Sequence, residues 1–244
     1  MEAIKPKLNY SVCKKEKGGI PVIIAAAGSS SRMKGADKQF IRIGGIPVIA
    51  RTLLAFERSP DISKIILVTR EQSVNDMQLI AEKYMISKLT DIVVGSDTRQ
   101  KSVICGLEKL QNNEDKVLIS DGARMFVTKK QISDCVKALE NHDGCVTAVK
   151  VNDTVKKVEN GVVISTVDRT PLYLAQTPQG ITVSLYRKAL ENVDITALTD
   201  DASVMEAGGF DVAVVEGDRK NIKITTTEDI ALAEIVLKEM SVCE

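Results

Sequence analysis

The sequence has few aromatic residues, no net charge and no long apolar run. Only 3% of its 244 residues are aromatic, none is tryptophan, and 33 basic residues balance 33 acidic ones. Binding of nucleic acid usually needs a broad positive surface and aromatic side chains that stack on bases, so we expect no nucleic-acid partner. No segment is apolar enough for a membrane span, and the N-terminal segment lacks the apolar centre of a signal peptide, so we expect no membrane association.

Cysteine and histidine are also sparse. The five cysteines are widely spaced and include no Cys-x-x-Cys pair, so the sequence favours neither a disulfide framework nor a zinc site. A reducing, cytoplasmic location is therefore expected. The single histidine, His142, lies in a polar turn, and without a second candidate base a hydrolase triad is excluded.

Strand-like and helix-like segments alternate along the chain. The predicted strands are 21–27, 64–69, 91–94, 117–120, 145–151 and 212–216. This alternation predicts an α/β fold with a mainly parallel, twisted sheet and helices on both faces. We expect one domain over residues 19–244, preceded by a disordered leader over 1–18.

Two apolar stripes at helical spacing are expected to pack in the core. They consist of Val103, Leu107 and Leu110, and of Leu232, Ile235, Val236 and Met240. The second stripe belongs to a predicted C-terminal helix. Thr225 and Glu228 have the spacing of a capping box, which predicts that this helix starts near Glu228.

One segment departs from the alternation. Residues 154–167 read as two short strands around Asn160-Gly161, a dipeptide suited to a two-residue hairpin turn. An isolated hairpin is marginally stable in water and needs a surface to pack on. That surface is either its own domain or a second subunit, in which case residues 152–168 form an arm.

The most informative segment follows the first predicted strand. Gly28 and the stretch Ser29-Ser30-Ser31-Arg32 come directly after apolar residues, and Lys38 follows closely. Backbone N–H groups in such a loop, with two cations beside them, are suited to binding phosphates. Neither the Walker pattern nor the three-glycine dinucleotide pattern is present. The alternative is a tight strand-to-helix turn with solvated cations.

Two other predicted strands are followed by polar groups, and ligands of open α/β sheets bind at such strand ends. Asp121, within 120–124, could orient a hydroxyl group or a magnesium ion, or simply form an Asp-Gly turn. The segment 95–99, with Ser102, opens a helix, and by itself it is better explained as an N-cap cluster.

Further polar segments are unremarkable when taken one at a time. They are 168–169, 176–179, 199–201 and 221–223. Thr199 and Asp200 are ordinary helix caps, Arg169 is a solvated hairpin end, and Lys223 is an edge-strand charge on this local reading.

Taken together, the polar segments occur in an order that resembles the cytidylyltransferases of the methylerythritol phosphate pathway. The similarity runs from Ile20 to Met240. It is carried by Ala-Ala-Gly-x-x-x-Arg-Met at 26–33, Lys-Gln-Phe at 38–40, and segments 97–107, 153–156, 167–169, 176–179, 199–203 and 221–225. The resemblance implies a Rossmann-like nucleotidyltransferase fold, similar to glycosyltransferase A, and transfer of a cytidylyl group from CTP to 2-C-methyl-D-erythritol 4-phosphate.

The resemblance also implies roles for individual residues. Arg32 and Lys38 would be catalytic, stabilising the transferring phosphoryl group. The positions implied to bind the nucleotide are Ala25, Ala26, Ala27, Gly28, Ser29, Ser30, Ser31, Ser96, Asp97, Ser102 and Gly122. The positions implied to bind the acceptor are Asp121, Arg124, Thr154, Arg169, Thr177, Thr199 and Lys223, with Thr154 and Arg169 coming from the arm of a second subunit. The hairpin then becomes the dimerisation element of a homodimer, and Mg²⁺ is held mainly by the CTP phosphates rather than by protein ligands.

The chain departs from the family pattern at three places. Ser30 replaces a loop glycine, Asp37 replaces the proline before Lys38, and 120–125 reads Ser-Asp-Gly-Ala-Arg-Met instead of His-Asp-Ala-Ala-Arg-Pro. Asp37 either positions the Lys38 ammonium or repels a triphosphate. Two alternative functions therefore remain: a cytidylyltransferase for another polyol phosphate such as ribitol 5-phosphate, and a dimeric regulator that binds CTP without turning it over.

Overall fold

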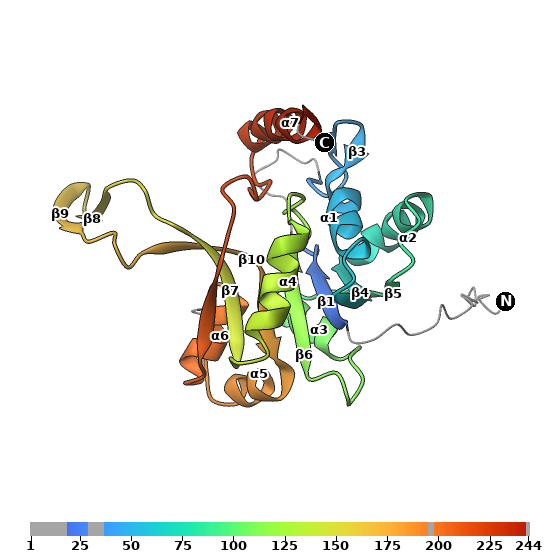
Figure 1. Ribbon diagram of the computed structural model, residues 1–244, viewed down its shortest axis with the longest axis horizontal. Coiled ribbons are helices and arrows are strands. Elements are labelled where there is room, and N and C mark those ends of the chain that lie inside the picture. The colour runs from blue at the N-terminus through green and yellow to red at the C-terminus, as the bar shows by residue number, and fades with distance from the viewer. Residues whose placement is uncertain (1–18, 29–36, 195–197, 243–244) are drawn as a thin grey trace.

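A seven-stranded sheet forms the centre of the fold in the computed structural model, which describes residues 19–28, 37–194 and 198–242 (Figure 1). Its strand order is β11-β7-β10-β6-β1-β4-β5. The strands are β1 (Ile20–Ala25), β4 (Ile62–Thr69), β5 (Leu89–Val94), β6 (Lys116–Asp121), β7 (Gly144–Lys150), β10 (Tyr173–Thr182) and β11 (Val212–Glu216). The predicted α/β class and all six predicted strands of the sheet are confirmed, with small shifts at their ends. The predicted leader, 1–18, lies outside the described residues.

The sequence analysis missed the seventh strand, β10. This strand pairs antiparallel with both β6 and β7, whereas the other pairings in the sheet are parallel. Its polar segment Gln176-Thr177-Pro178-Gln179 interrupts the local strand pattern and coincides with a shift in the pairing with β7. The strand tolerates these residues because tertiary contacts satisfy them. For example, the Asn221 amide donates to the Thr177 carbonyl at 2.9 Å.

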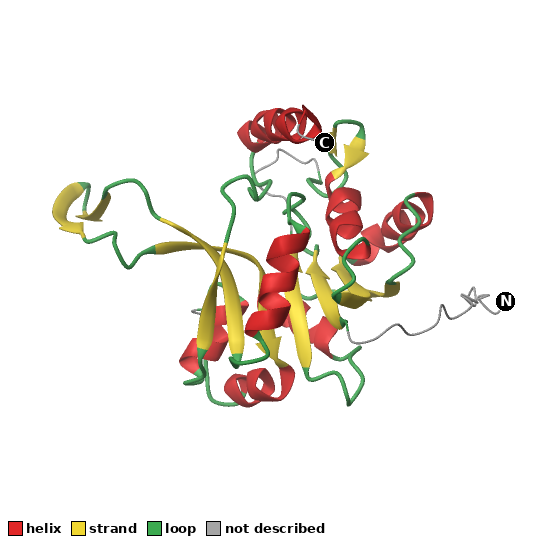
Figure 2. Cartoon of the chain, in the orientation of Figure 1, coloured by secondary structure: helices red, strands yellow, loops and turns green. Residues whose placement is uncertain are grey.

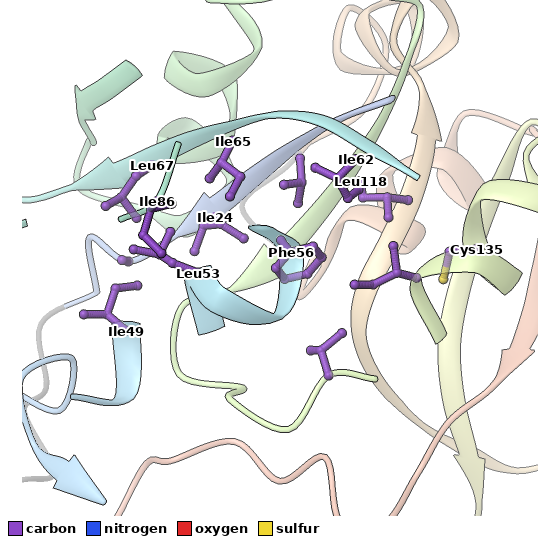
Figure 3. Packing of buried hydrophobic residues seen from close by; sticks show 14 of the residues in the cluster. Ile24, Ile49, Leu53, Phe56, Ile62, Ile65, Leu67, Ile86, Leu118 and Cys135 are labelled. Carbon is purple, nitrogen blue, oxygen red and sulfur yellow. The ribbon is translucent and has the colours of Figure 1, made fainter. Parts of the chain in front are cut away.

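Helices cover both faces of the sheet. On one face lie α1 (Val48–Glu57), α2 (Val74–Lys83) and α4 (Lys129–Ala138), and on the other lie α3 (Arg99–Leu107), α5 (Val183–Leu190) and α6 (Asp201–Ala207). Figure 3 shows Phe56 of α1 among Ile24, Leu53 and Leu118 in the first of these layers. On the other face Val103 and Leu107 are buried and Leu110 packs against them, as the helical spacing predicted.

A third, smaller apolar cluster lies outside the sheet. It joins α7 (Thr227–Val242) to the short hairpin of β2 (Arg42–Ile43) and β3 (Ile46–Pro47), neither strand of which was predicted. The predicted core stripe of α7 is wrong except for Val236. Leu232, Ile235 and Met240 are exposed, because α7 packs through Ile230, Ala233, Val236 and Leu237, a stripe turned around the helix from the predicted one.

The predicted start of α7 near Glu228 is confirmed to within one residue, but the capping carboxylate belongs to Asp229 rather than to Glu228. The helix begins at Thr227, and the Asp229 carboxylate accepts hydrogen bonds from the backbone N–H groups of Thr225 and Thr226, both at 2.8 Å. A carboxylate in the first turn satisfies N–H groups that have no partner within the helix. Among the described residues, no helix is long and apolar enough to cross a bilayer.

The predicted hairpin is confirmed. Strands β8 (Val155–Glu159) and β9 (Val162–Val167) pair antiparallel, and Asn160 and Gly161 both have positive φ, at 49° and 79°. The hairpin projects away from the sheet at the end of two long connections (Figure 2). It carries the exposed apolar side chains Val158, Val162, Val163 and Ile164. The structure thus disfavours packing on its own domain.

The buried position of Phe56 gives a test of the first core layer. Its side chain is fully buried, so Phe56→Ala should lower the free energy of unfolding by about 3–5 kcal/mol, through lost transfer energy and the cavity left behind. Urea unfolding followed by circular dichroism measures this change. The control is Leu79→Ala on α2, whose side chain is 62% exposed and should cost about 0.5 kcal/mol or less. Equal losses in the two variants would contradict the assigned core.

Candidate active site

The carboxyl ends of four neighbouring strands meet at one edge of the sheet. Strand β1 ends at Ala25 between β4 and β6, and β5 pairs with β4 on the far side. Polar or small residues follow each strand: Gly28 after β1, Arg70 after β4, Ser96 after β5 and Gly122 after β6. Buried hydrophobic strands therefore deliver the chemically active groups to a single place, as is usual for open α/β sheets.

A cleft of about 430 Å³ lies at this edge. Its walls are Ala25, Ala27, Gly28, Lys38, Gln39, Arg70, Ser96, Asp97, Thr98, Arg99, Ser102, Asp121, Ala123 and Lys223. Most of the predicted nucleotide-binding positions that are described, and the predicted catalytic Lys38, are in this set. The size falls in the range typical of small-molecule sites.

Two predicted nucleotide-binding residues lie behind the cleft wall. Ala26 is buried, and the Gly122 N–H donates to the Ala25 carbonyl at 2.9 Å. A Cβ at Gly122 would come within 2.9 Å of the Ala26 Cβ and 3.0 Å of Gln39 Oε1, so glycine allows close packing of the wall. Ser29, Ser30, Ser31 and Arg32 lie outside the described residues.

The helix α3 contributes one wall through its N-terminus. Thr98 is the N-cap and accepts a hydrogen bond from the Lys101 N–H at 3.2 Å. The buried Ser102 hydroxyl donates to the Thr98 carbonyl at 2.8 Å, and accepts from the Ser96 N–H at 3.0 Å. The N-cap interpretation of this segment is therefore confirmed, and the same cap forms part of the cleft.

Asp121 is the centre of a buried charge cluster. Its carboxylate contacts Lys223 Nζ at 2.8 Å, Arg99 Nε at 3.2 Å and Arg124 Nε at 3.6 Å. Burial opposes its ionisation, but Arg99, Lys223 and Arg124 together hold the pKa of Asp121 well below its usual range. The carboxylate therefore stays ionised and fixes three cations. The expectation that Lys223 is a plain edge-strand charge is wrong, because this residue lies in a loop and points to Asp121.

A second buried carboxylate also contacts Arg99, through a different nitrogen from the one that contacts Asp121. Asp201, at the start of α6, contacts Arg99 Nη2 at 2.7 Å and accepts a hydrogen bond from the Tyr186 hydroxyl at 3.2 Å. Burial by itself lowers the pKa of Arg99, yet Asp201 and Asp121 outweigh that effect and raise it. Arg99 is thus a permanent cation held by two carboxylates.

A smaller pocket, of about 200 Å³, adjoins the cleft. It is lined by Arg99, Asp121, Arg124, Ala175, Gln176, Thr177, Gln179, Thr199, Asp200 and Lys223. Arg99, Asp121 and Lys223 belong to both spaces. The predicted acceptor-binding positions Asp121, Arg124, Thr177, Thr199 and Lys223 therefore gather in one pocket, next to the cleft for the predicted nucleotide.

The walls of this pocket are held by the polar segment of β10. The Gln179 side-chain carbonyl accepts hydrogen bonds from the N–H groups of Asp201 and Ala202 at 3.0 and 2.9 Å, and its amide donates to Asp200 at 2.8 Å. The Thr177 hydroxyl accepts from the Asp121 N–H at 3.0 Å and lies 3.1 Å from the Ser120 hydroxyl. Ser120, which departs from the family pattern, is thus buried beside Thr177 rather than exposed in the cleft.

Thr154 and Arg169 lie at the base of the arm and line neither space. Both are exposed, and Arg169 donates to the Asn152 carbonyl. Their position in a single chain does not bring them to the site.

Several lining residues were given no binding role from the sequence, although Asp200 was correctly expected to be a helix cap and is the N-cap of α6. They are Gln39, Arg70, Thr98, Arg99 and Ala123 in the cleft, and Ala175, Gln176, Gln179 and Asp200 in the pocket. The strand-end rule would have found Arg70, which directly follows the predicted strand 64–69. Arg99 could have been identified from the sequence, because it lies in the segment 95–99 that opens the helix α3. Of the pocket residues on β10, Thr177 was implied by the resemblance, whereas Ala175, Gln176 and Gln179 were missed because the strand itself was missed.

Solved structures establish the class of protein. The chain is similar to 4-diphosphocytidyl-2C-methyl-D-erythritol synthase from Anaerococcus prevotii, with a TM-score of 0.78 and 34% identity over 90% of this chain and 96% of that one. It is also similar to 2-C-methyl-D-erythritol 4-phosphate cytidylyltransferase from Thermus thermophilus, with a TM-score of 0.74 and 29% identity over 91% and 100%. The fold is that of an α/β nucleotidyltransferase.

The family follows from the sequence comparisons. A family model for 2-C-methyl-D-erythritol 4-phosphate cytidylyltransferase matches residues 20–239. The enzyme of that name from Halalkalibacterium halodurans is 42% identical over 221 residues, covering 89% of this chain and 96% of its own. The one from Bacillus cereus is 43% identical over 220 residues, covering 89% and 97%. The chain belongs to the 2-C-methyl-D-erythritol 4-phosphate cytidylyltransferase family, as its motifs indicated.

Proposed function

We propose that this chain transfers the cytidylyl group of CTP to 2-C-methyl-D-erythritol 4-phosphate, giving 4-diphosphocytidyl-2-C-methyl-D-erythritol and pyrophosphate. Family membership supports this reaction. The structural observation that carries it is the pair of adjoining spaces that share Arg99, Asp121 and Lys223. Two substrates bound in these spaces meet at the shared wall, which is what a group transfer requires.

In the proposed mechanism, a 4-phosphate oxygen of the acceptor attacks the α-phosphorus of CTP in line. A new P–O bond forms, the bond between the α-phosphorus and the bridging oxygen breaks, and pyrophosphate leaves with the electron pair. Lys38 and Arg32 stabilise the negative charge that develops, and Lys223 and Arg124 hold the acceptor phosphate. Catalysis is then mainly positioning and charge stabilisation.

Magnesium, in this proposal, comes with the nucleotide. No group of three or more side chains suited to hold a metal occurs among residues 19–28, 37–194 and 198–242. The two carboxylates in the described lining of the cleft already have other partners. Asp121 contacts three cations, and Asp97 contacts Lys101 at 3.0 Å and the Ser96 hydroxyl at 2.9 Å. These residues do not fit a protein-built magnesium cage, whereas CTP phosphates are hard oxygen ligands that Mg²⁺ prefers.

The decisive experiment is a pyrophosphate-release assay with CTP and Mg²⁺. We expect release with 2-C-methyl-D-erythritol 4-phosphate and a far lower rate without an acceptor. A matched panel containing ribitol 5-phosphate and erythritol 4-phosphate tests the acceptor. Preference for ribitol 5-phosphate would replace the proposed acceptor, and saturable CTP binding without pyrophosphate release under any acceptor would instead support a regulator. A cytoplasmic location stays a prediction from the cysteine pattern.

We also propose that the arm joins two copies into a homodimer and carries Thr154 and Arg169 to the acceptor pocket of the partner. The exposed apolar residues of the arm support this proposal, since a hairpin of this kind is unstable in water without a surface to cover it. Thr154 and Arg169 lie at its base, away from both spaces of their own chain.

The arm can be tested with Val163→Asp/Ile164→Asp. Val163 and Ile164 are more than half exposed, at 56% and 54%, so the change should leave the fold of the monomer intact while placing charge in the interface. Size-exclusion chromatography with light scattering should show wild type at twice the 26.5 kDa chain mass and the variant at that mass. Leu79→Asp, on α2 away from the arm, should remain dimeric. A monomeric wild type would contradict the dimer.

A further inference from the structure

Asp37 and Arg70 form an ion pair at the rim of the nucleotide cleft. Arg70 follows β4 and lines the cleft, and its Nη2 contacts Asp37 Oδ2. Both side chains are largely buried, at 27% and 17% exposure. Arg70 Nε is also buried and has no hydrogen-bond partner among the described residues. The contact with Asp37 is therefore an anchor of this guanidinium on the cleft wall.

Asp37 also shapes the turn that contains Lys38. Its Oδ1 accepts the Gln39 N–H at 3.1 Å, and its backbone carbonyl accepts the Phe40 N–H at 3.0 Å. A side-chain acceptor of this kind stabilises a tight turn. One oxygen of the carboxylate thus holds the backbone around Lys38, and the other holds Arg70.

The charges that line the cleft explain why the Asp37–Arg70 ion pair matters for binding a polyphosphate. Arg99 and Lys223, two of the lining cations, are engaged with Asp121. Lys38 and Arg70 are the other two cations in the described part of the lining, and Arg70 is paired with Asp37. A carboxylate directly before Lys38 would oppose a polyphosphate unless another charge neutralised it, because partly buried charges interact strongly.

We propose that Asp37 and Arg70 are a charge-compensating pair at the Lys38 turn, in which Arg70 neutralises the carboxylate that shapes this turn, so that CTP can bind beside it. Asp37 supplies the turn, and Arg70 removes the electrostatic penalty of having an anion there. This inference rests on the proposed binding of CTP in the cleft.

A double-mutant cycle tests the pair. The affinity for CTP is measured by isothermal titration calorimetry for wild type, Arg70→Gln, Asp37→Asn and the double variant. Arg70→Gln should weaken binding about tenfold because the Asp37 carboxylate loses the positive charge of Arg70. Asp37→Asn keeps the turn acceptor and should bind CTP no more weakly than wild type. The double variant should return to within about threefold of wild type, since neutralising one charge compensates for losing the other.

Recovery of CTP affinity in the double variant distinguishes charge compensation from a merely structural role of the pair. A double variant as weak as Arg70→Gln would overturn the pair, as would wild-type affinity in Arg70→Gln. If Arg70→Gln does not fold, Asp37→Asn alone still tests the proposal. A tenfold weaker affinity of Asp37→Asn for CTP would overturn charge compensation. The loss in Arg70→Gln should also shrink at high salt.

An ion pair at the start of β4, the strand that Arg70 follows, provides the control. Lys64 of β4 contacts Glu114 at 2.7 Å with similar burial, near the start of the strand and away from the cleft. The cycle Lys64→Gln with Glu114→Gln should leave the affinity for CTP unchanged, and a matching loss there would overturn the inference. Wild type is measured first: if it binds no CTP and releases no pyrophosphate, the proposed function itself falls. Binding by wild type without coupling in the cycle overturns the pair alone.

Discussion

Lys38→Ala should lower kcat about a hundredfold or more while changing the affinity for CTP by less than about tenfold. Lys38 lies in the cleft wall at the carboxyl edge of the sheet. A cation about 4 Å from a phosphoryl oxygen contributes roughly 4 kcal/mol at an effective dielectric constant near 20, and this interaction grows as negative charge accumulates in the transition state. The lysine should therefore matter more for the reaction than for binding.

The measurement combines pyrophosphate release under saturating CTP with direct titration of CTP. Lys38→Arg keeps the charge and should recover part of the rate. Lys109→Ala is the matched control, because Lys109 is exposed and follows α3 at the opposite edge of the sheet. Unchanged kcat in Lys38→Ala would remove this residue from the mechanism. Arg32→Ala is expected to behave like Lys38→Ala, although Arg32 lies outside the described residues.

The location of the site was predictable from the sequence because one rule sufficed. Small or polar residues after apolar strands marked Gly28, Ser96 and Asp121, and parallel strands necessarily bring their carboxyl ends together. The same rule marks Arg70, whose partner Asp37 was identified only as a departure from the family pattern. The contact between Arg70 and Asp37 depends on the tertiary structure, so no local sequence pattern could predict it.

The missed strand β10 shows a limit of prediction from local sequence patterns. Gln176 bonds to the backbone of Asp218, and Gln179 caps α6, so polar side chains occupy the middle of a central strand. Sequence periodicity treats such residues as loop formers, because it cannot see partners that are distant along the chain. The exposed stripe of α7 has a related cause. An amphipathic helix with apolar residues on several sides can be assigned the wrong buried face until its packing surface is known.

Asp121→Asn is expected to lower acceptor-dependent pyrophosphate release about a hundredfold or more. The variant keeps the size of the side chain but removes the anion that fixes Arg99, Arg124 and Lys223. Removing one member of a buried ion pair costs about 3–5 kcal/mol, and each 1.4 kcal/mol corresponds to about tenfold in an equilibrium or rate. The loss should fall mainly on the use of the acceptor, because Arg124 belongs to the acceptor pocket and not to the cleft.

Acid unfolding gives a second and independent measurement of the same group. The pKa of Asp121 is lowered in the folded chain, so its ionisation contributes stability that is fully present above the ordinary aspartate pKa of about 4 and is lost as the pH falls toward the lowered value. Asp121→Asn should be less stable than wild type at pH 7, and this difference should narrow below about pH 4, where Asp121 takes up a proton in the unfolded wild-type chain but remains ionised in the folded one. Asp134→Asn, in an exposed pair with Lys130 on α4, should show neither effect. A pH-independent difference between Asp121→Asn and wild type would mean that the carboxylate does not hold the three cations, and the two substrate spaces would then lose the charged wall that joins them.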